Sequence, residues 1–542
     1  MQNRFFSLIL IFSISIFLFG QDSLKNQNVE ILTPYKPIID DADKKPNTPL
    51  PLKKMESKQN TFKYNLPDKI YHQDYKPSSI KAIAYPKERL KELGKNYTRF
   101  GIGYPLNSYL DISLNTKRNK YYESGALFSF NHWQGKINEL QRESNASTQL
   151  YTLRYFETMA VGIDFNLDLN GYNYYGIDSS LNNLDVNTFE DHKQNLTNVD
   201  FGFKLFNHQK NSFGLNYKIN GGLNLFQAKE RLEQSRLIFN AELKKDVFDQ
   251  DDISLSFENI FNSTSFDTTS STQNNMHIRG VYFYNREKLQ IKLGLNTVFE
   301  TNESLYMVPE LYSETKLLKN HLIYYTGWTG YKRINNLSEI FSFNPFAFID
   351  SIPRATKHNI KYTGVKGKIN QDLSYVLNAS YDNMRNKLFF HSYSNDTRKF
   401  IPAAINVDLV NLSAELSIKI NKQFECIYRG DYYEYDIDTA LGEEAWHMPN
   451  FKMGVLARYS IKNKLKLSST IDYWGQTKNK NAAGNVEKIE GFIDASINAN
   501  YIYRENISFV ISLNNLLGKT YNRWANYPVL GFNALVGVHF SF

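Results

Sequence analysis

The stretch FNALVGVHFSF, Phe532–Phe542, decides how this 542-residue sequence is interpreted. Apolar residues occupy every second position and end on Phe542, and the residues between them are Asn533, Leu535, Gly537, His539 and Ser541. Alternation with period two is typical of a β-strand that has one apolar face. The sequence therefore predicts an amphipathic strand at its C-terminal end.

The same alternation recurs from Tyr97 onward. It is clearest in four runs, which are 163–169, 289–295, 410–420 and 493–499. Each run has about the length of a tilted strand that crosses a bilayer with its apolar side toward lipid. A soluble β-sandwich gives similar alternation in shorter strands, and it is the structural alternative.

Composition supports the membrane interpretation. The mean hydropathy of −0.48 suits a soluble protein, but aromatic residues make up 15% of the chain. A transmembrane barrel reconciles both values, because every second strand residue faces an aqueous lumen and aromatic girdles mark the membrane interfaces. The predicted fold is therefore an all-β, antiparallel transmembrane barrel, with outer-membrane lipid around it.

Residues 1–20 have the layout of a secretory signal peptide. Arg4 is followed by an apolar run from Phe5 to Phe19 and by small Gly20. A membrane-anchor helix is the alternative, but the run is shorter than the roughly 20 residues that cross a bilayer. We expect cleavage near Gly20, and export to the outer membrane of a Gram-negative cell.

Residues 21–96 form a second region. Eight of the fifteen prolines lie between Gln21 and Lys95, and Asp22–Lys95 holds 15 basic against 10 acidic residues. This composition cannot bury enough apolar surface to offset the entropy of ordering. We expect a mostly unstructured tail that is periplasmic or docked in the lumen. Most of the net charge of +8 lies in this region, where a solvated linker accounts for it. We therefore expect no nucleic-acid partner.

Turn signals give the barrel, residues 97–542, its strand number. Short polar turns alternate with longer connections such as Lys136–Ser147 and Arg333–Lys357, as expected for periplasmic turns and extracellular loops. Strands counted between them number 21 if residues 99–116 form one strand. A turn at Pro105–Asn107 splits that segment, since proline is tolerated in turns but not inside a ladder. The predicted total is 22.

Motifs for catalysis, cofactors or metals are absent from the sequence. Cys426 is the single cysteine and is expected to pack as a small apolar residue, and the ten histidines form no ligand cluster. Gly518-Lys519-Thr520 lacks the first glycine of a phosphate-binding loop. The acidic alternation from Asp164 to Asn170 is explained by a lumen-facing strand rather than a calcium loop. We expect no enzyme activity, no cofactor and no metal.

The C-terminal residues resemble a known family. The segments Ser512–Tyr521 and Gly531–Asn533, with the final Phe542, are similar to the last two strands of TonB-dependent receptors, whose barrels have 22 strands. The runs Val29–Pro37 and Phe100–Gly103 are similar to openings of receptor-like barrels of Bacteroidota that are poor in plug residues. The family normally carries a glycine-rich plug, and residues 21–96 are too short and proline-rich for one. The lumen must then be filled by the tail, by loops and side chains, or by a partner chain.

Two segments are candidate partner sites. Val29, Glu30, Ile31 and Leu32 lie where a TonB box would, and they could add a strand to a periplasmic TonB-like protein. Any β-prone tetrapeptide in a linker has the same appearance. The predicted loop 333–357 is rich in aromatic residues that would fold inward, seat a surface lipoprotein, or pack among the loops. These residues are Phe341, Phe343, Phe346 and Phe348.

The sequence thus favours a receptor-like outer-membrane barrel that handles transport or export with separate partner chains. A structural or assembly scaffold of an envelope complex is the alternative. The cargo and the partners are not encoded in any recognisable motif.

Overall fold

The computed structural model describes residues 96–542, except 117–118, 136–139, 177–191, 210, 212, 230–231, 249, 268, 301–304 and 438–442. The predicted signal peptide, the proline-rich tail and Val29–Leu32 lie outside the described residues.

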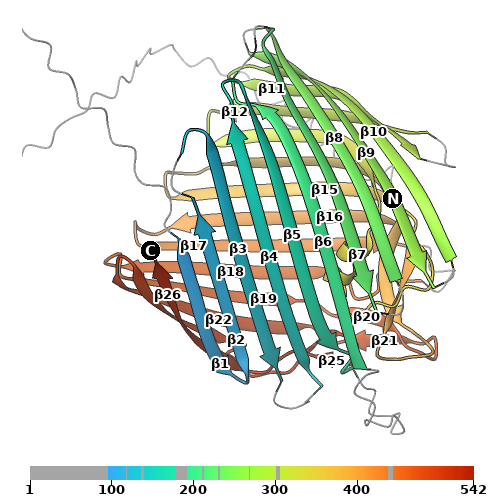
Figure 1. Cartoon of the computed structure of the whole chain (residues 1–542), viewed down its shortest axis with the longest axis vertical. Coiled ribbons are helices and arrows are strands. Elements are labelled where there is room, and N and C mark those ends of the chain that lie inside the picture. The colour runs from blue at the N-terminus through green and yellow to red at the C-terminus, as the bar shows by residue number, and fades with distance from the viewer. Residues whose placement is uncertain are drawn as a thin grey trace, which may run out of the picture. The chain divides into compact units, whose positions relative to one another are not determined.

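One antiparallel sheet of 22 strands makes up the barrel, and the pairing of β1 with β26 closes it (Figure 1). Closure pairs the backbone of every strand with two neighbours, which lipid requires because it offers no hydrogen bonds. The predicted all-β barrel and its strand number are confirmed. The strands are β1 (Tyr97–Tyr104), β2 (Asn107–Asn115), β3 (Tyr122–Gln134), β4 (Arg142–Tyr155), β5 (Met159–Asn173), β6 (Lys193–Asn207), β7 (Leu215–Ala228), β8 (Leu232–Phe248), β9 (Asp251–Phe266), β10 (Thr269–Asn285), β11 (Leu289–Glu300), β12 (Tyr306–Leu318), β13 (Leu322–Arg333), β14 (Thr356–Lys368), β15 (Leu373–Ser392), β16 (Phe400–Lys419), β17 (Phe424–Asp436), β18 (Phe451–Ile461), β19 (Leu465–Trp474), β22 (Phe492–Arg504), β23 (Ile507–Asn514) and β26 (Asn533–Ser541).

Alternation along the strands places apolar side chains outside, as predicted. Ile163 is 58% exposed and Leu293 is 52% exposed, although both lie in the middle of strands. Their polar neighbours turn inward, where Asp164 Oδ1 lies 2.8 Å from Lys204 Nζ. Large apolar groups that remain exposed around the whole barrel form a belt that lipid covers.

The proline-containing turn near the start of the barrel is also confirmed. β1 ends at Tyr104 and β2 begins at Asn107. By contrast, the predicted long loop Lys136–Ser147 was wrong at its second half, because β4 already begins at Arg142. The first residues of β4 are polar and lie beyond the apolar belt. They therefore lack the alternation of apolar residues from which a strand is predicted.

A close approach of backbones marks the seam between the first and last strands. Gly101 lies opposite Gly537 in the β1–β26 pairing. A Cβ atom on Gly537 would lie 2.4 Å from Tyr109 Oη, and that oxygen is 3.3 Å from His539 Nε2. The tyrosine ring therefore occupies the space that side chains at these two positions would need.

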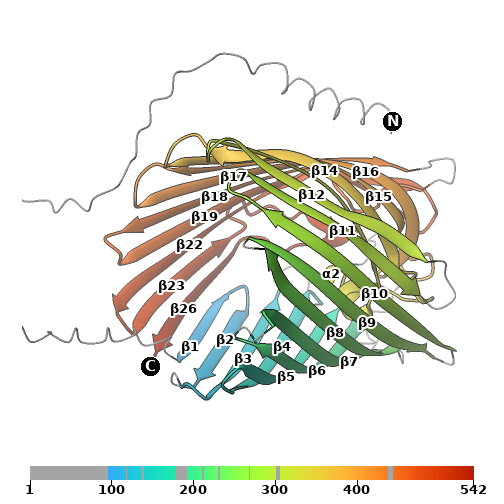
Figure 2. The ribbon, with the colours of Figure 1, turned by 90° about the horizontal axis from the view of Figure 1, so that it is seen from above.

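The two ends of the barrel differ. Short turns such as the one between β4 and β5 form one end, called the turn end here, and longer connections form the other, called the loop end. The loop end carries α2 (Leu337–Phe343) and two small hairpins, β20 (Thr477–Lys480) with β21 (Val486–Ile489) and β24 (Asn522–Trp524) with β25 (Tyr527–Pro528). Figure 2 shows α2 inside the ring of strands.

Within the described residues, no helix is long and apolar enough to cross a membrane. Cys426 is buried in β17, which agrees with its expected packing role.

Candidate functional site

The loop end is covered by an apolar core that is built from connections far apart in the sequence. Its members come from the strands and loops around β3–β4, β5–β6, β7–β8, β13–β14, β15–β16, β19–β22 and β23–β26. This loop core consists of Leu140, Tyr172, Tyr174, Tyr175, Leu196, Phe226, Ala228, Leu232, Leu337, Ile340, Phe341, Phe346, Ala347, Ile349, Leu388, Phe390, Phe400, Ile489, Trp524, Ala525 and Tyr527.

Tyr527 lies at the centre of the loop core and is 1% exposed. Its ring stacks on Phe346 with 3.6 Å between the centroids and meets Tyr175 edge-on at 4.8 Å. Its hydroxyl donates to the Arg398 carbonyl oxygen, and the Tyr175 hydroxyl donates to the Pro528 carbonyl oxygen over 3.3 Å. Burial raises the pKa of Tyr175 to about 12, so this phenol stays protonated and keeps donating.

The four phenylalanines predicted to bind a partner divide into two pairs. Phe341 stacks on Phe226 at 5.7 Å, and Phe346 is buried against tyrosines. Phe343 stays 44% exposed although it touches Trp524, and Phe348 stacks on Tyr393. The placement of Phe341 and Phe346 agrees with packing among the loops, which was one of the three alternatives. Binding of a lipoprotein stays a prediction.

Local hydrogen bonds explain where α2 begins and how it is held. Asn336 is the N-cap, and its Oδ1 accepts from the Glu339 amide over 2.7 Å. The Leu337 amide donates to Gln234 Oε1 of β8 over 3.0 Å. Leu337, Ile340 and Phe341 are the buried face of the helix. The helix is therefore fixed to the inner wall by a polar bond at its start and by apolar packing along one side.

His447 fastens three loop-end segments together and is 1% exposed. Its Nδ1 is 2.7 Å from the Phe390 carbonyl oxygen and its Nε2 is 3.2 Å from the Ala525 amide nitrogen. These partners require a neutral ring that donates from Nδ1 and accepts at Nε2. Burial lowers the pKa of His447 to about 3, which keeps the ring neutral at physiological pH.

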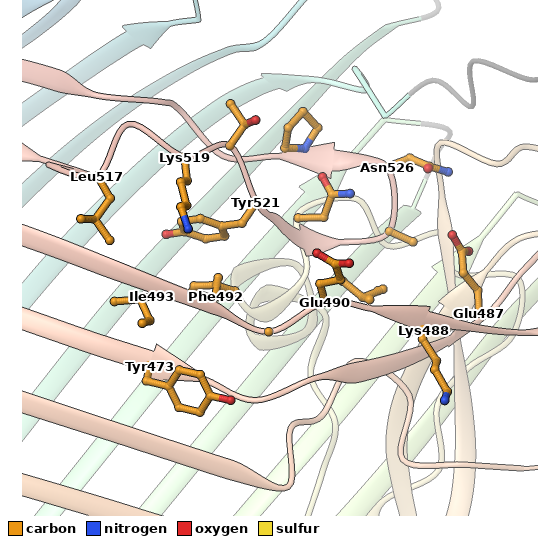
Figure 3. Close-up of a pocket in the computed structure, with 16 residues that line it drawn as sticks. Tyr473, Glu487, Lys488, Glu490, Phe492, Ile493, Leu517, Lys519, Tyr521 and Asn526 are labelled. Atoms are coloured by element: carbon orange, nitrogen blue, oxygen red, sulfur yellow. The ribbon is translucent and has the colours of Figure 1, made fainter.

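A pocket of about 630 Å³ lies at the rim between the β20–β21 hairpin and the 515–532 loop (Figure 3). Tyr473, Ile493 and Leu517 supply apolar surface, and Lys519 and Glu490 supply charge. The pocket is lined both by Ile493, which is 47% exposed on the belt side of β22, and by Phe492 on the other face of that strand, so it lies at the rim of the barrel.

A second cavity of about 490 Å³ lies on the inner wall of β7–β13, next to the start of α2. Some of its charged lining is paired: Arg279 Nη2 lies 2.6 Å from Glu310 Oε1, and Lys332 forms a buried ion pair with Glu300. The cavity shows that the lumen remains polar below the loop core.

The described residues contain no group of three or more His, Cys, Asp or Glu side chains that could hold a metal ion. Asp168, part of the acidic alternation in β5, accepts from Ser147 Oγ over 2.6 Å on the lumen face. This is the lumen-facing strand that the sequence predicted there.

Sequence reasoning missed the residues that cover the loop end. Trp446 and Trp524 lie in connections at the loop end and are 1% and 5% exposed within packed cores. The density of aromatic residues in these loops was the available signal. It did not reveal their partners, because those are distant in the chain.

Comparison with known proteins gives a match at the level of structure. No family matches the sequence, and no curated protein matches it. The fold is similar to the FrpB iron transporter of Neisseria meningitidis, with a TM-score of 0.67, 9% identity and 83% of each chain covered. It is also similar to the ferric enterobactin receptor PfeA of Pseudomonas aeruginosa, with a TM-score of 0.65, 11% identity, and 83% of this chain and 80% of that chain covered. For the siderophore receptor PirA of Acinetobacter baumannii the TM-score is 0.64, with 11% identity and 84% and 81% covered.

The fold thus defines a class, the outer-membrane type of transmembrane β-barrel. A closed antiparallel barrel with an apolar belt is stable in that setting, and the predicted location is confirmed at the level of architecture. The likeness to receptor barrels supports the receptor-like architecture that the C-terminal residues suggested. The Bacteroidota type and the missing plug stay predictions.

Proposed function

We propose that this chain is a receptor-like outer-membrane barrel that takes part in transport or export together with separate partner chains. The observation that carries the proposal is a polar lumen covered at one end by a packed loop core. The fold neighbours, which are receptors and transporters, support a transport role rather than an enzymatic one.

A covered lumen suits controlled passage. Charged and amide side chains line the inner wall, as in the cavity beside α2, so solutes could pass there without crossing lipid. In this proposal the loop core closes that path with apolar side chains, which stacking and hydrogen bonds hold together. Passage would require these loops to move apart, which a ligand or a partner could drive by binding the open arrangement better.

Ion conductance in planar bilayers tests the proposal. The wild-type barrel is expected to conduct little, and the double variant Phe346→Ser/Tyr527→Ser to conduct more, because the variant places hydroxyls in the centre of the loop core. Phe343→Ser serves as the matched control, since that ring is 44% exposed. Equal, negligible currents from all three proteins would refute transport and favour the scaffold alternative.

The partner sites can be tested separately. The proposal assigns Val29–Leu32 to a periplasmic TonB-like protein, and Phe343 and Phe348 to a surface lipoprotein. Native pull-down with mass spectrometry of the full chain, of a variant lacking residues 29–32, and of Phe343→Ser/Phe348→Ser should show the loss of one partner each. An unchanged set of captured proteins would count against both sites.

A scaffold role is the second candidate. It is favoured only if the barrel stays silent in bilayers and co-purifies with other envelope proteins in fixed ratio.

A further inference from the structure

A row of side chains crosses the inner face of three strands at the loop end. Lys452 of β18 lies directly opposite Trp474 of β19, which lies opposite Phe492 of β22. The adjacent residues Phe451 and Ile493 are exposed on the belt side. Since neighbouring strand residues point to opposite faces, the row faces the lumen.

Two cations share the indole ring in this row. Lys452 Nζ lies 4.1 Å from the centroid of the Trp474 ring, and the guanidinium carbon of Arg523 lies 4.2 Å from a ring centroid of the same residue. Arg523 also lies over Trp524 at 5.3 Å. Within the described residues neither cation makes an ion pair or donates a hydrogen bond, and both lie over aromatic rings.

The guanidinium charge of Arg523 persists at neutral pH. Burial lowers the pKa of Arg523 only to about 10, with Tyr521 opposing the change. Guanidinium and ammonium groups that are partly withdrawn from water normally have a carboxylate partner, because desolvating an uncompensated charge is costly. Their donors therefore remain available to an anionic group that the described residues do not supply.

Two carboxylates lie beside the row. Asp472 and Asp494 are direct cross-strand partners, an arrangement of like charges that destabilises a sheet. The Tyr521 hydroxyl donates to Asp494, whereas Asp472 has no hydrogen bond or ion pair in the described part of the chain. Asp472 precedes Trp474 by two residues on one strand face, a separation of roughly 7 Å. Its own cross-strand neighbour on the other side is Gly454, which has no side chain to shield it.

We propose that this surface, formed by Lys452, Asp472, Trp474, Asp494 and Arg523, binds a zwitterionic solute such as a short peptide or an amino acid. The solute carboxylate lies against Lys452 and Arg523, and its ammonium group lies between Asp472 and Asp494. A simple anion would be repelled by the two carboxylates, and a metal cation would be repelled by the two basic side chains. Only a ligand that carries both charges compensates all four groups.

The biological role of this site rests on the proposed transport function, but binding of the solute can be tested without it. Calorimetry with the purified full chain in detergent uses three probes: trialanine, N-acetyl-trialanine and trialanine amide. The first carries both charges, and each of the others lacks one. Trialanine is expected to bind at least tenfold more tightly than either blocked peptide, and to change the tryptophan fluorescence because Trp474 lies within the site.

Variants locate the binding. Asp472→Asn and Arg523→Gln should each weaken trialanine binding at least tenfold, which corresponds to the loss of one charge-assisted hydrogen bond. Asp472→Asn removes like-charge repulsion, so it should fold at least as well as the wild type. Arg458→Gln is the matched control, because Arg458 lies on β18, pairs with Glu425 at 3.4 Å and lies outside the row.

The outcomes separate the two proposals. No binding of trialanine, equal binding of a blocked peptide, or an equal effect of Arg458→Gln would overturn the site. A barrel that conducts but does not bind trialanine would leave the transport proposal standing. A silent barrel that binds trialanine would keep the site and refute transport.

Discussion

Replacement of Tyr527 by alanine should open the loop core without unfolding the barrel. The ring is 1% exposed, stacks on Phe346 at 3.6 Å and contacts Tyr175 and Phe400 at 4.8 and 5.8 Å. Truncating a buried aromatic residue to alanine costs about 3–5 kcal/mol. Tyr527→Phe removes only the hydrogen bond to the Arg398 carbonyl oxygen and should cost about 1 kcal/mol. The difference of about 3 kcal/mol corresponds to roughly a hundredfold change in the local opening equilibrium.

Hydrogen exchange measured by mass spectrometry provides the assay. Loop amides near 345–349 and 522–528 should exchange roughly a hundredfold faster in Tyr527→Ala than in Tyr527→Phe, because exchange there follows local opening. Strand amides should be unchanged, since the ladder of the barrel does not depend on this ring. The reasoning is refuted if the two variants exchange alike, or if the strands lose protection together with the loops.

Three further predictions concern the seam, a buried histidine and the start of α2. Gly537→Val should impair barrel closure, since a Cβ at this position would lie 2.4 Å from Tyr109 Oη. Gly221→Ala should be tolerated, because the space around Gly221 is open. Loss of heat-modifiable mobility in gel electrophoresis measures the failure of closure. The folded-state pKa of His447 is about 3, below its usual value near 6.5, so the unfolded loop binds more protons than the folded loop between these two pH values. The stability of the loop should therefore fall as the pH drops from 6.5 toward 3, by up to about 1.4 kcal/mol per pH unit. Hydrogen exchange measured against pH should show this slope, and His447→Gln should flatten it. Asn336→Ala should destabilise the α2 loop by about 1 kcal/mol, because the N-cap hydrogen bond is lost. Glu339→Gln should cost less than about 1 kcal/mol, because its ion pair with Arg333 is about half exposed. The protease sensitivity of the loop should therefore rise more in Asn336→Ala than in Glu339→Gln.

The sequence and the structure agree most closely where a local rule applies. Period-two alternation around Ile163 and Leu293 correctly gave strands and their outward face, because each strand needs only a lipid side and a water side. The turn at Pro105 gave an even strand number, because proline is favoured in a turn and removes a hydrogen bond where it lies inside a ladder. Errors occurred where strands extend beyond the belt, as at Arg142, because alternation of apolar residues ends with the lipid.

The candidate sites were predictable only in part. The phenylalanines of the predicted loop 333–357 were recognised as an apolar cluster that would not stay in water, but not as partners of Phe226 and Tyr527. Lys452, Asp472 and Arg523 carry no motif, and they come together only because β18, β19 and the 515–532 loop meet at the lumen.

The sequence by itself determined that residues from Tyr97 onward form a membrane barrel of 22 strands, because lipid on one side and water on the other impose a pattern that each strand shows alone. Only the tertiary structure decided that the loop end is covered by a packed aromatic core and that charged side chains of opposite sign share one face of the lumen. Closure of the barrel brings together residues hundreds of positions apart, such as Tyr175 and Tyr527, and no local pattern of residues records such a meeting.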